Sequence, residues 1–586
     1  MKLSFQTWIH RLKLVLIRFP FTLIYLVGLS VLCFLSIQKV NVEIKESLWV
    51  FFALGILLNV AVTLYLEEFK QQNSRILLNV ISSVLLTIYC FTLPEKLQAY
   101  QHYQLIALGL VFILSAFFVS FFNKDNEIPF WNFGKESIIQ LVISGVFSSV
   151  LFGGLSLAVL SLDKLFGIHV SPKVYSDLSI VSFVLFAPIY FLSNVPDEIE
   201  KRSQQVSFDK IIKIFGLYIL LPILAIYTLI LYVYLIQIIF NWQLPNGWVS
   251  TLVSVLAMGG FLCLLILYPL YVSNENKTVD RFSRLFPVLL FPLLILMSTG
   301  IARRIADYDL TINRLYVLIL NSWFYGISIY LFVSEAKHVK WIVISFATVA
   351  FLSSVGPWSV FSLTRKSLAT QLEQQLTQAR LMKDGKMVTD QKSIQKPDVL
   401  TQERVVETVQ YMVKTYGSES LQPYFSVSMK NKSAFDVLAL MKMEASSVGA
   451  NRYFYLHLSN DSFIFDTGSY PMLVVLNTSG DEKNPTGKKT VCENSQLRVD
   501  LLSDNLIVTN KLKNNSTITI ALRNKIQELL KEKRRNEKEL FDIGKMTIKG
   551  LNYTLIIRTA NGKQDNSKGL LMLSNFNAYL FLRLDK

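Results

Sequence analysis

The sequence contains few of the residues on which catalytic and metal-binding sites most often depend. It has five His and four Cys among 586 residues, and only His457 lies after residue 363. Three cysteines, Cys33, Cys90 and Cys263, lie within apolar stretches, which leaves Cys492 alone in the polar remainder. An internal disulfide, a cysteine metal cluster and a His-x-x-x-His zinc site are therefore excluded from that remainder, and we expect no metal or cofactor.

Charged side chains are also scarce, at 17 % of the chain compared with about a quarter in an average soluble protein. In their place are 52 % hydrophobic residues, 41 Phe and a positive mean hydropathy of +0.41. No Asp or Glu lies centrally in a long apolar stretch. Ionisable residues within membrane helices usually mark ion or proton pathways, so this absence argues against the carboxylate proton relay of many transporters.

Long apolar stretches fill the first 363 residues, and none follows Leu363. A helix that crosses the roughly 30 Å hydrocarbon core needs about 20 apolar residues. On this criterion we predict eleven spans, at about 19–37, 47–66, 76–93, 104–122, 138–162, 178–195, 214–240, 249–272, 285–301, 315–333 and 341–363. The sixth, with Pro188, and the ninth, with Pro287 and Pro292, are short, which leaves a re-entrant segment open as an alternative.

The first residues indicate a helix that lies at the membrane surface. Residues 1–18 mix apolar side chains such as Trp8 with basic ones such as Arg11 and Arg18, which is typical of a basic interfacial helix. The following stretch, 19–37, is uncharged and lacks the small-residue cleavage site of a signal peptide. We therefore expect it to remain as a transmembrane anchor.

Lysine and arginine are distributed unevenly over the loops, which predicts the orientation. With the N-terminus in the cytoplasm, the cytoplasmic loops hold Lys70, Arg75, Lys124, Lys135, Lys201, Arg202, Lys210, Lys277, Arg281, Arg284, Lys337 and Lys340. The opposite loops hold fewer, and eleven spans then export the C-terminal domain to the periplasmic or extracellular side. Arg365 and Lys366, directly after the last span, argue mildly against this. We attribute the formal charge of +16 to this topology signal and expect no nucleic-acid partner.

Small residues recur at helical spacing in the fifth span, at Ser144, Gly145, Ser148, Ser149, Gly153, Gly154 and Ser156. Such residues allow the backbone of a neighbouring helix to approach closely, so we expect a helix contact face here. A substrate-lining face is the alternative.

The most concentrated polar element lies between the ninth and tenth spans. If it is helical, Arg303 and Asp307 lie four residues apart, as do Arg304 and Tyr308, so that charges can pair along one face. Thr311 is placed to cap the tenth helix by accepting from the backbone N–H of Asn313 or Arg314. The element is then a well-anchored interfacial loop or, alternatively, an anion or lipid head-group site to which Arg303, Arg304, Tyr308, Thr311, Asn313 and Arg314 contribute.

The same region carries a family resemblance. The segments "RRIADYDLTINRLYVLILNSWFYGISIYLF", "KWIVISFATVAFLSSVGPWSVFSLTRKS", "LFGGLSLAVLSLDKLFG" and "FAPIYFLSNVP" are similar to the bacterial inner-membrane family catalogued as domain of unknown function 4153. The similarity runs from about the fifth span to the start of the tail and is most specific at Tyr308–Arg314 and Gly356–Trp358. In that family a Gly often follows the Tyr of the first motif, where this chain has Asp309. The resemblance implies a polytopic inner-membrane protein and brings no catalytic residues.

Gly356 and Pro357 interrupt the last predicted span. Proline removes a backbone donor, so we expect a helix break at this point, either structural or acting as a hinge. Trp358 beside them is typical of an anchor at the membrane interface.

The remaining residues predict a soluble α+β domain at 399–586, joined by a helical stalk and linker at 364–398. The stalk helix is expected from Thr364 to Met382, and further helices at about 400–416, 434–444 and 522–540. Alternating β-branched and aromatic residues predict strands at 453–458, 472–476, 497–502, 516–521, 545–551, 553–557 and 579–584. Asn561-Gly562 is typical of a turn, and the segment at 480–490 fits a hairpin loop better than a phosphate loop.

These observations predict a polytopic α-helical membrane protein, with about eleven transmembrane helices and a C-terminal α+β soluble domain. We expect a non-enzymatic scaffold, sensor or partner-binding protein of the bacterial inner membrane, in contact with membrane lipids and with an envelope protein or component. A transporter or lipid-handling protein is the first alternative, and a cavity lined by Arg303, Arg304, Asn313 and Arg314 would distinguish it. A membrane-embedded enzyme is the second.

Overall fold

The computed structural model describes residues 5–38, 45–67, 72–121, 126–168, 170–201, 203–205, 208–241, 248–307, 310–378, 381–383, 385–387, 399–441, 452–458, 470–479, 488–502, 505–512, 516–536, 540–565 and 570–583. The chain divides into two compact units, Met1–Ala369 and Thr370–Lys586, each with a hydrophobic core of its own. The boundary falls within one helix, α16 (Val360–Gln378). Residues 364–369 of the predicted stalk thus belong to the first unit.

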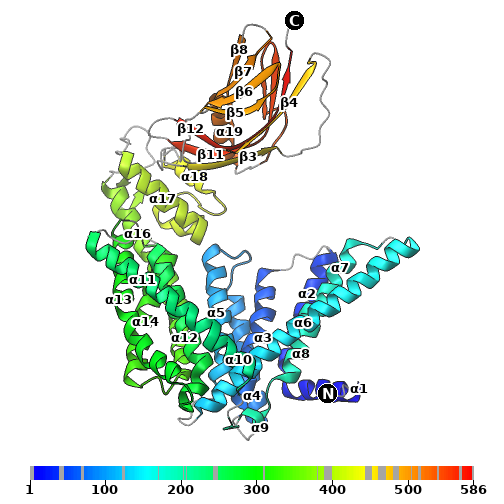
Figure 1. The fold of residues 1–586 in the computed structure, drawn as a ribbon, viewed down its shortest axis with the longest axis vertical. Helices are drawn as coiled ribbons and strands as arrows, with labels where there is room; N and C mark the ends of the chain where they lie inside the picture. The colour runs from blue at the N-terminus through cyan, green and yellow to red at the C-terminus, as the bar shows by residue number, and fades with distance from the viewer. Residues whose placement is uncertain are drawn as a thin grey trace. The chain divides into compact units, whose positions relative to one another are not determined.

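The first unit is helical throughout its described residues (Figure 1). Its elements are α1 (Phe5–Arg18), α2 (Pro20–Gln38), α3 (Glu46–Leu66), α4 (Gln72–Phe91), α5 (Ala99–Phe118), α6 (Glu127–Phe166), α7 (Pro172–Ser179), η1 (Ile180–Phe186), α8 (Ala187–Asn194), α9 (Glu198–Lys201), α10 (Lys210–Ile214), η2 (Phe215–Leu220), α11 (Leu221–Asn241), α12 (Trp248–Val272), α13 (Lys277–Asp307), α14 (Ile312–Val333) and α15 (Lys340–Ser354), followed by α16. Figure 1 shows α1 lying crosswise to the long helices.

Within the described ranges, nine helical segments are long and apolar enough to cross a bilayer. They are Pro20–Gln38, Glu46–Leu66, Ala99–Phe118, Glu127–Phe166, Pro172–Asn194, Lys210–Asn241, Val249–Val272, Lys277–Ile305 and Ile312–Val333. The predicted spans at 76–93 and 341–363 correspond to shorter apolar helices, Ile76–Phe91 and Lys340–Ser354. The polytopic helical fold is therefore confirmed, whereas the count of eleven spans is not.

Proline explains two irregular helices in this unit. The π-helical segments η1 and η2 end two residues before Pro188 and Pro222, respectively. Because proline has no backbone N–H, the carbonyl four residues earlier loses its usual donor. In the wider i to i+5 pairing, that carbonyl accepts instead from the N–H of the residue after the proline. In contrast, α13 continues as one helix of 31 residues through Pro287 and Pro292, so the ninth predicted span is one unbroken helix.

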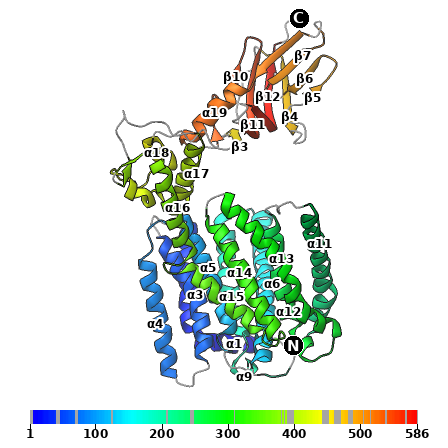
Figure 2. The ribbon, with the colours of Figure 1, turned by 90° about the vertical axis from the view of Figure 1, so that its left-hand side faces the viewer.

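Glycines allow α2 and α3 to pack closely. A Cβ atom at Gly28 would lie 2.0 Å from the Phe52 ring, and one at Gly55 would lie 2.2 Å from the Tyr25 ring. Each helix therefore receives an aromatic ring of the other against its bare backbone, which is the close packing that small residues permit in membrane helices. A second core joins α12, α13 and α14, which lie side by side in Figure 2.

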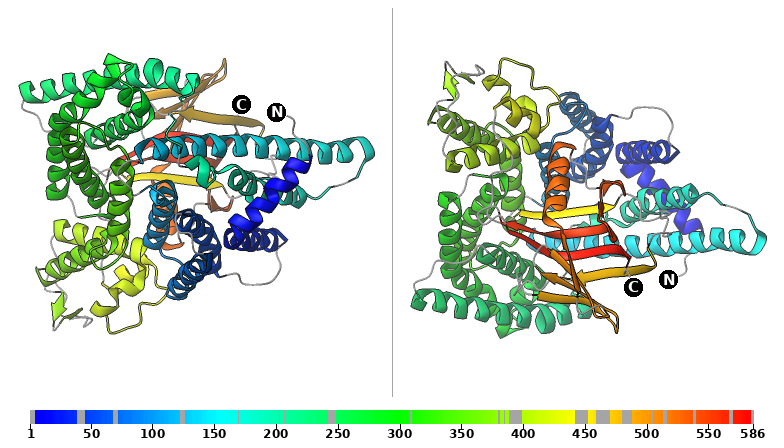
Figure 3. Two further views of the ribbon diagram at one scale, coloured as in Figure 1. Left: turned by 90° about the horizontal axis from the view of Figure 1, so that it is seen from below. Right: turned by 90° about the horizontal axis from the view of Figure 1, so that it is seen from above.

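The longest helix, α6, is 40 residues long, or about 60 Å at 1.5 Å per residue, and extends beyond the other helices of this unit in Figure 3. Its small residues do not form one contact face. Ser144 and Ser148 are buried, but a Cβ added at Gly145, Gly153 or Gly154 would meet nothing within 4 Å among the described residues. The predicted helix contact therefore involves Ser144 and Ser148 but not these three glycines.

The second unit combines helices with two sheets. It contains the end of α16, a short hairpin of β1 (Met382–Lys383) and β2 (Lys386–Met387), and the helices α17 (Val399–Tyr416), η3 (Ser418–Tyr424), α18 (Ala434–Leu440) and α19 (Arg523–Asn536). The longer strands are β3 (Arg452–Leu458), β4 (Met472–Ser479), β5 (Lys488–Glu493), β6 (Leu497–Leu502), β7 (Asn505–Asn510), β8 (Ser516–Ala521), β9 (Leu540–Phe541), β10 (Thr547–Lys549), β11 (Tyr553–Asp565) and β12 (Leu570–Leu582).

One core lies between the two sheets. The six-stranded sheet has the order β4-β12-β11-β3-β9, with β10 also paired to β11, and the four-stranded sheet is the meander β5-β6-β7-β8. All described strand pairs are antiparallel except β3 with β9. Leu456 and Phe576 from the first sheet, Val499 from the second and Ile526 from α19 belong to the same buried cluster.

The α+β class predicted for this domain is confirmed, but several details differ. The prediction of a turn at Asn561-Gly562 was wrong, because both residues lie inside β11, at a register shift opposite β12. The predicted loop at 480–490 lies outside the described residues except for its last three, which begin β5. The stalk helix ends at Gln378, before the predicted Met382, and residues 388–398 of the predicted stalk and linker lie outside the described residues.

Candidate functional site

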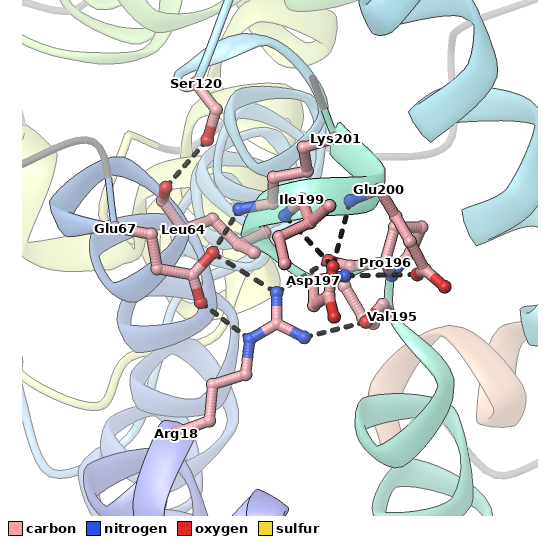
Figure 4. Close-up of polar contacts among 10 residues, drawn as sticks. All are labelled: Arg18, Leu64, Glu67, Ser120, Val195, Pro196, Asp197, Ile199, Glu200 and Lys201. Carbon is pink, nitrogen blue, oxygen red and sulfur yellow. Dashed lines mark hydrogen bonds and ion pairs between the residues drawn. The ribbon is translucent and has the colours of Figure 1, made fainter. Parts of the chain in front are cut away.

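A cluster of three charged side chains lies where α1, α3 and α9 end (Figure 4). Glu67 directly follows α3, Arg18 is the last residue of α1, and Lys201 is the last residue of α9. The Arg18 guanidinium donates from Nε to Glu67 Oε1 at 2.6 Å and from Nη2 to Oε2 at 3.2 Å, a bidentate arrangement. Lys201 Nζ donates to Glu67 Oε2 as well. One carboxylate therefore holds two cations from distant parts of the chain.

Arg18 also binds the backbone at the end of α8. Its Nη1 donates to the carbonyl of Val195 at 2.7 Å, and its Nη2 donates to the carbonyl of Pro196 at 2.7 Å. Val195 is the C-cap residue of α8, and such a carbonyl has no partner within the helix and carries partial negative charge, which makes it a suitable acceptor for a cation; Pro196 directly follows it. Arg18 thus joins the ends of α1, α3 and α8.

The cluster is largely shielded from solvent. The side chain of Lys201 is 1 % exposed and that of Glu67 is 10 % exposed. Lys201 Nζ also lies 5.6 Å from the centre of the Phe133 ring, within the range of a cation–π contact. Burial alone would raise the pKa of Glu67, but the hydrogen bond from Arg18 and the positive charge of Lys201 outweigh it and hold the pKa below its ordinary value of 4.5. Glu67 is therefore ionised at neutral pH.

Local sequence explains how Lys201 reaches this position. Asp197 and Glu200 form a capping arrangement around the single turn of α9. Asp197 Oδ1 accepts from the backbone N–H of Glu200 at 2.9 Å, and Glu200 Oε2 accepts from the N–H of Asp197 at 3.3 Å. Ser120 donates to the Leu64 carbonyl at 2.7 Å, which fixes the end of α3 beside Glu67. Both arrangements are visible in Figure 4.

A second buried carboxylate is arranged in a similar way. Glu127, the first residue of α6, accepts at Oε2 from the backbone N–H of Lys340 at 3.1 Å, and its Oε1 lies 3.6 Å from Lys340 Nζ. His338 Nδ1 lies 3.5 Å from the same oxygen. The Lys340 side chain is 3 % exposed. This cluster joins the start of α6 to the start of α15, and in the predicted topology both clusters are at the cytoplasmic ends of the helices.

A pocket of about 720 Å³ lies beside the first cluster. Its walls come from α1, from the first part of α6 and from residues 192–205. Arg11 of α1 donates to Asn194 Oδ1, and Asn132 of α6 donates to the Gln205 carbonyl at 2.8 Å, so polar contacts hold the walls together. Because Arg18, Val195 and Pro196 belong both to the cluster and to the lining, the cluster shapes the pocket.

The residues predicted from sequence as an anion or head-group site lie elsewhere. Arg303 and Arg304 are exposed near the end of α13, and Asn313 and Arg314 are in the first turn of α14, exposed and half-buried, respectively. Thr311 occupies the N-cap position of α14, but its side chain makes no capping hydrogen bond, so only the position was predicted correctly. Tyr308 lies outside the described residues, and the head-group role of this set stays a prediction.

Gly356 and Pro357 lie between α15, which ends at Ser354, and α16, which begins at Val360. Gly356 has φ +88°, a value that side-chain-bearing residues rarely adopt. The helical path of the last predicted span is thus interrupted at these residues, and the hinge role stays a prediction.

Sequence reasoning did not identify Glu67 as a site residue. It follows an apolar stretch and looks like an ordinary loop residue, and its partners Arg18 and Lys201 are 49 and 134 residues away. The one available signal was a pair of acidic residues, Glu67 and Glu68, directly after a predicted span. Among the described residues, no three His, Cys, Asp or Glu side chains gather as a metal site.

Comparison with known proteins gives two matches. The family model described as Domain of unknown function (DUF4153) matches residues 21–379. An uncharacterized protein of Pasteurella multocida (strain Pm70) is 22 % identical over 399 residues, which cover 65 % of this chain and 67 % of that protein. No solved structure matches. The predicted resemblance is confirmed, and it begins earlier than predicted, within the first span.

Replacing the shared carboxylate with an amide should destabilise the membrane unit. In Glu67→Gln, Lys201 stays buried without its anionic partner, and removing one member of a buried pair typically costs about 3–5 kcal/mol. Thermal unfolding of the purified protein in mild detergent measures the effect. The matched control is Glu275→Gln, which removes the exposed pair with Lys213 at 3.2 Å and should cost about 0–1 kcal/mol.

The pH dependence of the unfolding temperature, compared between wild type and Glu67→Gln, separates the effect of the Glu67 charge from that of its packing. Because the folded-state pKa of Glu67 is below 4.5, its contribution is complete at neutral pH and is lost as the pH falls through the folded-state pKa. The difference in unfolding temperature between wild type and Glu67→Gln should therefore shrink below pH 4.5. A difference that is the same at pH values above and below this range would contradict an ionised Glu67.

Proposed function

Because the chain belongs to the family described as Domain of unknown function (DUF4153), whose description assigns no activity, we propose a function from geometry alone. The protein is a non-enzymatic multi-pass protein of the bacterial inner membrane that carries a binding domain on its exported side. Its membrane unit is a scaffold, and its C-terminal α+β unit binds or senses a protein or other component of the envelope. Nucleic acid is not among the proposed partners.

The observation that carries this proposal is that the buried charged side chains are paired with one another. Glu67 is held by Arg18 and Lys201, and Glu127 by Lys340 and His338, all at helix ends. A proton or ion pathway needs ionisable groups that exchange partners along a route through the membrane. Charges that are buried against each other at helix ends instead join segments of the chain, which supports a scaffold over an ion-coupled transporter.

The C-terminal unit offers a surface suited to a partner. Strand β4 is hydrogen-bonded to β12 on one side, and no described strand pairs with its other side. Its outward side chains Leu473 and Val475 are 51 % and 59 % exposed. An unpaired, uncharged edge strand is a template for an added strand from another chain, with the exposed apolar side chains supplying specificity. This geometry supports recognition of an extended peptide segment.

The lipid-handling alternative is favoured by a different observation, the pocket beside α1. This alternative does not require the partner-binding role of the C-terminal unit.

The proposed orientation can be measured with reporters fused after Lys586. Since the basic residues favour a cytoplasmic N-terminus and an exported C-terminal unit, a reporter that is active only after export should give signal. A reporter that is active only in the cytoplasm should be silent when fused at the same position. The reverse result would place the binding unit in the cytoplasm and contradict the envelope partner.

Two charges on β4 should weaken partner binding without unfolding the protein. Leu473→Lys combined with Val475→Lys places two solvated cations on the exposed edge, where they block the addition of another strand. After in vivo crosslinking, we expect the partner recovered with this variant to fall about tenfold, a loss of about 1.4 kcal/mol. The control is Leu512→Lys with Leu551→Lys, which changes two exposed leucines elsewhere on the unit. Identical recovery with both variants would overturn the edge-strand proposal.

A further inference from the structure

The pocket beside α1 is lined by both charged and apolar side chains. The charged ones are Arg11, Arg18 and Lys135 together with Glu136, Asp197 and Glu200, so positive and negative groups are equal in number. Leu14 and Ile17 form part of the α1 wall and are 49 % and 79 % exposed. A site with charges of both signs next to exposed apolar groups matches a ligand that is itself amphipathic.

The three cations differ in what they already bind. Arg18 is engaged by the carboxylate of Glu67, and Lys135 Nζ lies 3.1 Å from Asp209 Oδ2. Arg11 donates to Asn194 Oδ1, an amide oxygen with no formal charge. A guanidinium has five N–H donors in a planar fork that matches the geometry of phosphate, so Arg11 is the cation of this pocket best suited to an anionic group.

The carboxylates make a purely anionic ligand a poor match. Glu136 accepts from Gln140 at 2.7 Å, and Glu200 accepts from the backbone N–H of Asp197, but each carboxylate has further lone pairs. A ligand with only negative charge would meet as many like charges as opposite ones. A ligand that carries an ammonium group beside a phosphate satisfies both sets.

The apolar side chains of α1 indicate a lipid rather than a small solute. Leu14 and Ile17 belong to the pocket lining and are exposed, so an acyl chain joined to a ligand in the pocket can lie along them. The volume of about 720 Å³ is within the 300–1,000 Å³ of typical ligand sites and far above the roughly 30 Å³ of one water.

We infer that this pocket binds the head group of a zwitterionic aminophospholipid, with Arg11 holding the phosphate, carboxylates such as Glu200 holding the ammonium, and the acyl chains lying along Leu14 and Ile17. The inference does not depend on the C-terminal unit, so failure of the β4 experiment would leave it standing. It also differs from the head-group site predicted at Arg303–Arg314, which lies between α13 and α14.

The test is lipid binding to the full-length protein in mild detergent, measured by native mass spectrometry. The probes are phosphatidylethanolamine, phosphatidylglycerol and free phosphoethanolamine. Wild type should retain phosphatidylethanolamine in preference to phosphatidylglycerol. Arg11→Gln should weaken this binding about tenfold or more, as expected for loss of a charge-assisted hydrogen bond. Lys13→Gln removes the same charge from an exposed position of α1 outside the pocket lining and should bind as wild type does.

A second variant keeps the inference testable if Arg11→Gln fails to fold. Glu200→Gln keeps a carbonyl acceptor for its backbone partner but removes the negative charge, so it should reduce the preference for phosphatidylethanolamine over phosphatidylglycerol. Equal retention of both lipids by wild type, or equal binding by Arg11→Gln and Lys13→Gln, would overturn the inference. Competition by free phosphoethanolamine as strong as that by the lipid would mean a soluble ligand and would likewise overturn it.

Discussion

The carboxylate of Glu67 binds two cations that would otherwise be buried together without an anionic partner at the ends of apolar helices. Moving an isolated ion out of water costs several kcal/mol even after the protein relaxes, so Lys201 at 1 % exposure and Arg18 at 20 % require a partner. Because the cations are in α1 and α9 and the carboxylate follows α3, both cations reach their anionic partner only when these segments meet. The need of these cations for an anionic partner therefore determines how the helices are arranged more than whether each helix forms.

The magnitudes support this distinction between arrangement and stability. At an effective dielectric constant of about 20, two unit charges 4 Å apart attract by about 4 kcal/mol, which is similar to the desolvation cost that each ion carries. The net stabilisation from such a cluster is small, but the loss from any arrangement that separates its members is large. Glu127 with Lys340 applies the same constraint to α6 and α15. The pocket depends directly on the Glu67 cluster, since Arg18 holds Val195 and Pro196 in the pocket wall.

Apolar length predicted most of the membrane helices, because a span must satisfy its backbone within one helix. It failed at 341–363, where Gly356 and Pro357 end the helix although the apolar residues continue into α16. In the second unit, β5 was missed because Lys488, Lys489 and Glu493 hide the alternation of a strand. Asn561-Gly562 has the chemistry of a turn, but pairing on both sides with β12 and β3 keeps it within β11. The Glu67 cluster was beyond prediction, because its members become neighbours only through the packing of distant helices.

Glu67 and its two cations form one interacting unit, and a double-mutant cycle at Glu67 and Lys201 tests this most directly. Thermal or denaturant unfolding is compared for wild type, Glu67→Gln, Lys201→Met and the double variant. We predict that Lys201→Met partly rescues Glu67→Gln, with a coupling free energy above about 1 kcal/mol, because it removes the cation that the first change leaves unpaired. Effects that add to within about 0.5 kcal/mol would contradict the central role given to this carboxylate.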